Sequence, residues 1–182
     1  MNDGRIALDR LNTCGRDEFV AALAGVFEHA PWVAAAAQGR VPFASVAAVH
    51  EALVGAVRAA PREQQLAFVR SHPELGSKVA QAGDLTAESK AEQGSLGLDR
   101  LSAEEFARFQ KLNTSYSQKF GFPFIMAVKG RSKAEIMAAF EERLEHETDE
   151  EFDAAIVQIE LIALLRLKDR LPSLADVFSS LA

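Results

Sequence analysis

Cysteine is nearly missing from this chain: Cys14 is the only one among 182 residues. An intramolecular disulfide is therefore excluded, and a zinc site built from thiolates is disfavoured. A lone cysteine is a weak signal for a nucleophile, so we interpret Cys14 as a small residue near the start of the first helix. The four histidines form no HxxxH or HExxH pattern, and we expect no metal site.

Basic clusters and long apolar runs are also missing. The formal net charge is −6, whereas a surface that binds nucleic acid needs concentrated positive charge, so we expect no nucleic-acid partner. The longest apolar stretch, residues 156–167, is interrupted by Gln158, Glu160 and Arg166, which argues against a membrane span. The first ten residues, MNDGRIALDR, lack the apolar run of a signal peptide. We therefore expect a cytoplasmic protein that does not associate with membranes.

No alternating run is long enough to indicate a sheet, and apolar residues instead recur at the spacing of amphipathic helices. The stripes are Phe19, Leu23, Val26 and Phe27; Val46, Val49, Leu53 and Val57; Leu66 and Val69; Phe106, Phe109 and Tyr116; Ile136, Phe140 and Leu144; and Phe152, Ile156, Ile159 and Ala163. Hydrophobic residues make up 48% of the chain, and no linker-like segment divides it. The sequence predicts an all-α fold, a single-domain helical bundle over residues 1–182.

Local signals predict several helix boundaries. Pro31 ends the first stripe, and Pro61 is well placed to begin a later helix. Two segments, beginning at Ser102 and Ser132, have the capping-box form, with a serine cap and a glutamate three residues later. The helix that follows Ser102 should end near Gly121.

Residues 122–128, FPFIMAV, do not fit a helical bundle. The segment is apolar, is broken by Pro123 and has no evident partner strand. Irregular backbone in an apolar environment leaves N–H and C=O groups without ladder partners. A ligand can satisfy these groups while the apolar wall excludes water, but a buried connector would have the same composition. Both interpretations stay open.

His72 also departs from the helical pattern. It stands between Ser71 and Pro73, and a proline moves the residue before it out of the helical region. A helix should therefore end here, with the imidazole projecting from a chain reversal, where it is a candidate for proton transfer. The alternative is a histidine that stabilises the carbonyl end of the preceding helix.

The segment from Thr86 to Gly94 can form a short helix with Thr86 as its cap. Ser89, Glu92 and Gln93 would then share one face, at positions i, i+3 and i+4. A hydroxyl, a carboxylate and an amide on one face can bind a polar heterocycle. A solvated helix surface would contain the same residues, so neither interpretation is favoured.

Arg166 falls on the core-facing stripe of the last helix, one step beyond Ala163. An arginine there is costly unless it is paired or holds an anion. Its planar guanidinium suits a carboxylate, and an acidic protein that binds an anion must concentrate its cations locally. The alternative is an internal salt bridge with an acidic residue.

Taken together and in order, segments covering residues 11–171 resemble one family, the 2-oxo-4-hydroxy-4-carboxy-5-ureidoimidazoline (OHCU) decarboxylases. Any one of these pieces would be weak, but the ordered set is specific. The matching pieces are Phe27-Glu28-His29-Ala30-Pro31-Trp32, His72-Pro73-Glu74-Leu75-Gly76, Glu88-Ser89-Lys90-Ala91-Glu92-Gln93, Leu112-Asn113 with Tyr116, Phe120-Gly121-Phe122-Pro123-Phe124, Ser132-Lys133, and Ile162-Ala163 leading to Arg166-Leu167.

The resemblance implies an enzyme of urate breakdown that converts OHCU to (S)-allantoin without a cofactor, in an all-helical and usually homodimeric protein. It implies that His72 is the proton donor, Glu92 its acidic partner, and Arg166 the residue that holds the small anionic substrate. The implied substrate-binding residues are Pro73, Ser89, Glu92, Gln93, Phe124, Ile125, Met126, Ala127, Val128 and Arg166.

Two other functions remain as alternatives to this resemblance. A non-catalytic helical module that binds a small ligand would use Arg166 in an internal ion pair and His72 as a helix stop. A metal-dependent hydrolase is disfavoured by the scattered histidines. Composition and periodicity alone indicate no more than a soluble helical domain.

Overall fold

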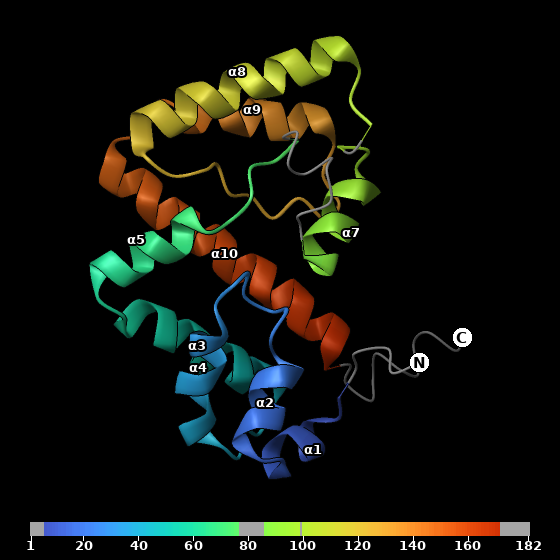
Figure 1. The fold of residues 1–182 in the computed structure, drawn as a ribbon, viewed down its shortest axis with the longest axis vertical. Coiled ribbons are helices and arrows are strands. Elements are labelled where there is room, and N and C mark those ends of the chain that lie inside the picture. The colour runs from blue at the N-terminus through green and yellow to red at the C-terminus, as the bar shows by residue number, and fades with distance from the viewer. Residues whose placement is uncertain (1–5, 77–85, 99, 172–182) are drawn as a thin grey trace. The chain divides into compact units, whose positions relative to one another are not determined.

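The computed structural model describes residues 6–76, 86–98 and 100–171 (Figure 1). Within these ranges the regular structure is helical and no strand is formed, which confirms the predicted all-α class. The chain divides into two compact units, one of residues 1–65 with 160–182 and one of residues 66–159. No helix in the described ranges is both long and apolar enough to cross a bilayer.

The first unit is built around α3 (Pro31–Ala37), which packs against α2 (Arg16–Ala22) and α4 (Val46–Ala59). It also contains α1 (Leu8–Thr13), the 3-10 helix η1 (Gln38–Arg40) and the end of α10 (Thr148–Arg170). Ser45 caps α4 by accepting a hydrogen bond from the Ala48 N–H. The apolar positions that the sequence predicts for α4 are largely buried, as expected for a helix whose apolar face packs against the core.

The predicted first helix is wrong in its extent. The helix α2 ends at Ala22, whereas Leu23, Val26 and Phe27 lie in turns and are nonetheless buried. The turns end at His29, whose φ of 50° is incompatible with a continuing right-handed helix. The side chain of Glu28, which lies in these turns, is buried as well.

The second unit contains most of α5 (Arg62–Arg70), then α7 (Ala87–Ser95), α8 (Ala103–Phe120), α9 (Lys133–Arg143) and the first part of α10. Both predicted capping boxes are present, at Ser102 and Ser132. The helices α8 and α9 pack side by side (Figure 1). Rings from these two helices and from the segment between them form much of the core, with Phe124 of that segment stacked on Phe140 of α9 at a centroid distance of 3.8 Å.

The helix α8 ends where the sequence predicts, at Gly121. This residue adopts a left-handed conformation with φ of 75°, which terminates the helix and directs the chain into residues 122–128. That segment runs without regular secondary structure to Val128, and every residue in it is buried. The core therefore contains a non-helical backbone segment, as the composition of FPFIMAV indicates.

Candidate active site

His72 lies just beyond the end of a helix, as Pro73 predicts. The helix α5 ends at Arg70, and His72 is half-buried in the bend that follows. Its Nδ1 lies 3.0 Å from the Phe68 carbonyl oxygen, and its ring meets the Phe68 ring edge-on at 4.9 Å between centroids. A carbonyl can only accept, so Nδ1 carries a proton and Nε2 is the nitrogen at which a neutral imidazole exchanges one.

The chain after His72 is fixed by side chains from two other helices. The Gln93 Oε1 of α7 accepts a hydrogen bond from the Gly76 N–H at 3.1 Å. The Asn113 Nδ2 of α8 donates to the Leu75 carbonyl at 2.9 Å. Gly76 has φ of 63°, and a Cβ there would lie 3.1 Å from Leu101 Cδ1, so a larger residue would be strained as well as crowded. These contacts bring the His72 segment next to α7.

The predicted helix that begins after Thr86 is present as α7. The Thr86 hydroxyl accepts from the Ser89 N–H at 3.3 Å, which confirms the cap. Ser89 and Gln93 are 6% and 4% exposed, and Glu92 is half-buried. The face that they share is therefore directed inward, and the interpretation as a solvated helix surface is wrong. Part of Gln93 has a structural role, because its carbonyl oxygen holds Gly76.

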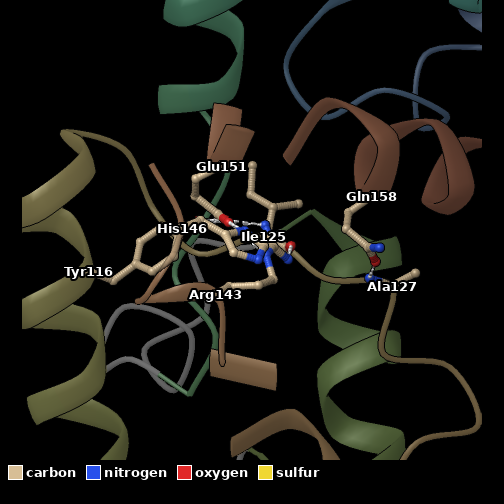
Figure 2. A network of polar contacts seen from close by, with 7 residues as sticks. All are labelled: Tyr116, Ile125, Ala127, Arg143, His146, Glu151 and Gln158. Carbon is tan, nitrogen blue, oxygen red and sulfur yellow. Dashed lines mark hydrogen bonds and ion pairs between the residues drawn. The ribbon is translucent and has the colours of Figure 1, made fainter. Parts of the chain in front are cut away.

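Within the described part of the chain, residues 122–127 leave most of their backbone groups without hydrogen-bond partners. Among the described residues, the backbone of residues 122–127 makes two hydrogen bonds, both to side chains. The Ile125 carbonyl accepts from Arg143 at 2.7 Å, and the Ala127 N–H donates to Gln158 at 3.0 Å (Figure 2). The segment thus combines a dry apolar environment with backbone donors and acceptors that a polar ligand can use.

Arg166 is buried in the first unit, where it has an acidic partner. Its exposed fraction is 6%, and its Nη1 lies 3.1 Å from Glu28 Oε2 and 3.2 Å from the Gly25 carbonyl oxygen. The internal salt bridge considered from the sequence is therefore formed. His72, Glu92 and residues 122–128 belong to the second unit.

Comparison with known proteins decides the family. The family model described as OHCU decarboxylase matches residues 12–168. The chain belongs to the OHCU decarboxylase family. The 2-oxo-4-hydroxy-4-carboxy-5-ureidoimidazoline decarboxylase of Haloferax volcanii is 42% identical over 168 residues, 92% of this chain and 98% of the relative. That of Halalkalicoccus jeotgali is 40% identical over 165 residues, 91% of this chain and 92% of the relative.

A solved structure of similar fold is the crystal structure of (S)-allantoin synthase. It matches with a TM-score of 0.74 at 26% identity, over 91% of this chain and 54% of the other. The chain therefore spans about half the length of that protein.

In the described ranges no three histidine, cysteine, aspartate or glutamate side chains gather as a metal site would require.

Sequence reasoning missed a second buried arginine in this family member. Arg143 is 9% exposed at the end of α9, where the stripe of Ile136 and Phe140 continues. The stripe predicted from the sequence continued to Leu144 instead, which is the residue after the helix ends. The spacing from Phe140 to Arg143 is the same signal that identified Arg166 on the last helix. Applying that test to every helix would have found Arg143.

Proposed function

We propose that this protein decarboxylates OHCU to (S)-allantoin, with His72 as the proton donor. The observation that carries the proposal is the family match over residues 12–168, which includes His72 and the buried segment 122–128. Relatives of nearly equal length are named as enzymes of this reaction. The hydrogen bond from Nδ1 to the Phe68 carbonyl supports the role, because it orients the imidazole and makes Nε2 the nitrogen that takes up the second proton and passes it on.

The reaction can proceed without an external electron sink. Breaking the bond between C4 and the carboxylate leaves an electron pair on C4, which shifts to form a C4=C5 bond. The pair of the former C=N bond moves to nitrogen, which takes up a proton. Proton delivery to C5 and loss of the C4 hydroxyl proton then give the carbonyl of allantoin. The net change is loss of CO₂ and uptake of one proton, and the substrate supplies the sink that a cofactor supplies elsewhere.

His72 would deliver the proton to one face of C5 and so set a single configuration. Spontaneous decay of OHCU gives racemic allantoin, so control of the protonated face is part of the proposed function. The apolar residues of the 122–128 segment would keep bulk water from the opposite face. The backbone groups of this segment that have no partner among the described residues would orient the polar ring, together with Ser89 and Gln93.

Glu92 and Arg166 complete the proposed set of catalytic residues. Glu92 would hold the hydroxyl or the ureido group and so the conformation in which the carboxylate leaves. Arg166 would bind the carboxylate of the anionic substrate, for which a planar guanidinium is well suited. Pro73 and residues 124–128 would line the pocket.

Replacing His72 by asparagine tests the proposal. Asparagine can still donate to the Phe68 carbonyl but cannot exchange a proton near neutral pH, so kcat should fall at least about a hundredfold with an unchanged far-UV CD spectrum. The assay follows optically active allantoin by circular dichroism, with enzymes that generate OHCU from urate present and this protein added last. The matched control is His50→Asn, because His50 contacts the Glu160 carbonyl in the first unit. Near-normal turnover of His72→Asn would remove His72 from the mechanism.

The alternative is a non-catalytic module that binds a small ligand, for which the Arg166–Glu28 pair is the supporting observation. It predicts no optical change when wild-type protein meets freshly generated OHCU. A metal-dependent hydrolase would lose activity with a chelator, whereas the proposed reaction should be insensitive to one. The homodimer and the cytoplasmic location that the resemblance implies stay predictions, to be checked by light scattering and by cell fractionation.

A further inference from the structure

A buried polar cluster lies beside residues 122–128, and the proposed reaction assigns it no role. It consists of Tyr116 on α8, Arg143 at the end of α9, His146 after α9 and Glu151 on α10 (Figure 2). Tyr116 and Glu151 are fully buried. Burying charged groups is costly unless they are paired, so a cluster of this kind needs a structural or functional reason.

Glu151 is the acceptor on which the cluster is centred. Its carboxylate accepts hydrogen bonds from Arg143 Nε at 2.9 Å, from Arg143 Nη2 and from the Tyr116 hydroxyl. His146 Nδ1 lies 2.8 Å from its other oxygen. Burial raises the pKa of Tyr116 above its usual range, so the hydroxyl stays protonated and keeps donating. Three side chains therefore hold the Glu151 carboxylate, and the carboxylate in turn orients the Arg143 guanidinium.

Arg143 also contacts the non-helical segment, residues 122–128. Its Nη1 donates to the Ile125 carbonyl at 2.7 Å, and its Cζ lies 4.6 Å from the centroid of the Phe124 ring. Phe124 is in turn stacked on Phe140 of α9. One oriented guanidinium thus fixes both the ring of one residue and the backbone of the next.

Gln158 of α10 holds the same segment two residues further along. Its Oε1 accepts from the Ala127 N–H at 3.0 Å (Figure 2). The carbonyl of Ile125 and the N–H of Ala127 are consequently occupied by side chains. Among the described residues, the other backbone groups of residues 122–127 have no hydrogen-bond partner.

We propose that Arg143 and Gln158 are positioning residues that fix the backbone of residues 124–127 so that its remaining donors and acceptors meet the substrate. Glu151 and Tyr116 act through Arg143, by orienting its guanidinium. This inference rests on the proposed function, because it takes residues 122–128 to be the wall of the OHCU site. It adds four residues that need not touch the substrate. It predicts that loosening the segment raises KM more than it lowers kcat.

Two replacements of Gln158 test the inference at one position. Gln158→Met keeps the length of the side chain but removes the acceptor for the Ala127 N–H, whereas Gln158→Glu keeps an acceptor there. We expect Gln158→Met to raise KM about tenfold with kcat changed less than about threefold, and Gln158→Glu to restore KM to within about threefold of wild type. A purely structural role would lower the active fraction of both variants without this split between KM and kcat.

Hydrogen exchange provides a readout that does not depend on activity. In Gln158→Met the peptide covering residues 121–128 should exchange faster, while peptides from the middle of α8 should be unchanged. Calorimetric titration with (S)-allantoin, the proposed product, should show weaker binding by Gln158→Met than by Gln158→Glu. Arg143→Lys should also bind (S)-allantoin more weakly, since lysine keeps the charge opposite Glu151 but has one nitrogen, which cannot span Glu151 and the Ile125 carbonyl as the guanidinium does. The control is Arg58→Lys, at an ion pair on α4 that is half-exposed.

The outcomes separate this inference from the proposed function. Wild-type protein that leaves the rate of OHCU decay unchanged would overturn the proposed function. If wild-type protein is active but KM is unchanged in Gln158→Met, the inference is overturned and the proposed function is not. Exchange in residues 121–128 that does not respond to Gln158→Met would also overturn it, whatever happens to KM.

Discussion

Two arginines occupy core-facing positions near the ends of helices, and each is compensated by a buried glutamate. Arg143 pairs with Glu151, and Arg166 pairs with Glu28. In both pairs the glutamate is almost fully buried. In each case the arginine side chain also contacts a backbone carbonyl, of Ile125 or of Gly25. Paired in this way, the guanidinium is held in one orientation, which is what a residue that positions backbone or substrate requires.

The Arg166–Glu28 pair allows stability and activity to be separated. Arg166→Met should destabilise the fold by about 3–5 kcal/mol, because it removes the guanidinium that neutralises the buried Glu28 carboxylate. The double variant Arg166→Met with Glu28→Met should recover most of that stability, since two apolar side chains replace the pair. It should remain inactive if Arg166 binds the substrate. Urea unfolding and the allantoin assay measure the two effects.

The control for this cycle is Glu28→Met alone, which should be destabilised by a similar amount, because the buried charge of Arg166 is then no longer neutralised by Glu28. Substantial decarboxylation by the stable double variant would show that Arg166 serves the fold and does not hold the substrate.

At the scale of helices, the two capping boxes begin α8 and α9 where the sequence predicts. In the second box, Glu135 Oε2 accepts from the Ser132 N–H at 2.7 Å and from its hydroxyl at 2.8 Å. These hydrogen bonds, that to the backbone first, lower the pKa of Glu135 below its ordinary value of 4.5. The corresponding bond from Ser102 lowers the pKa of Glu105. Both carboxylates therefore favour the folded state when they are ionised.

The capping boxes predict a pH dependence on the acid side. Because the pKa of Glu135 is lower in the folded state, its contribution is fully present well above pH 4.5 and is lost as pH falls through the folded-state pKa. Wild type should therefore lose more stability between pH 6 and pH 3 than Glu135→Ala does. Urea midpoints at the two pH values measure the difference.

Glu142→Ala is the matched control, since Glu142 lies exposed on the same helix but takes no part in the cap. Its loss of stability between the two pH values should equal that of wild type. A Glu135→Ala variant with the same loss as wild type would contradict the assignment.

At the scale of the whole chain, the helix α10 contributes to both compact units. Residues 148–159 belong to one unit and residues 160–170 to the other. Buried apolar residues recur along the helix on both sides of this division, including Ile156, Ile159 and Ala163. Unfolding of one unit would remove packing from a helix that the other unit needs, so the two should unfold together.

The chain offers one aromatic probe for each unit, because it contains a single tryptophan and a single tyrosine. Trp32 reports on the first unit, and Tyr116 reports on the second. We expect urea transitions followed by tryptophan fluorescence, tyrosine absorbance and far-UV CD to have the same midpoint. A tryptophan transition with its midpoint at a lower urea concentration than the other two would contradict this cooperative unfolding. The variant Leu53→Ala, in the buried face of α4, should shift all three midpoints equally.

The sequence alone determined the elements whose signals are local. The helical class, the capped starts of α8 and α9, the cap of α7, the end of α8 at Gly121 and the end of α5 before His72 all depend on side chains within a few residues. The same reasoning failed after Ala22, where the apolar spacing continues but the backbone turns. Apolar spacing marks which residues are buried, and turns can bury them as well as a helix can.

The tertiary structure decided which polar groups meet. Nothing local indicates that Glu28 pairs with Arg166, that Gln93 holds Gly76, or that Arg143 and Gln158 hold Ile125 and Ala127. These partners are separated by between 17 and 138 residues in the chain. Buried polar groups must find hydrogen-bond partners wherever the packing places them, so their pairing is a property of the folded chain.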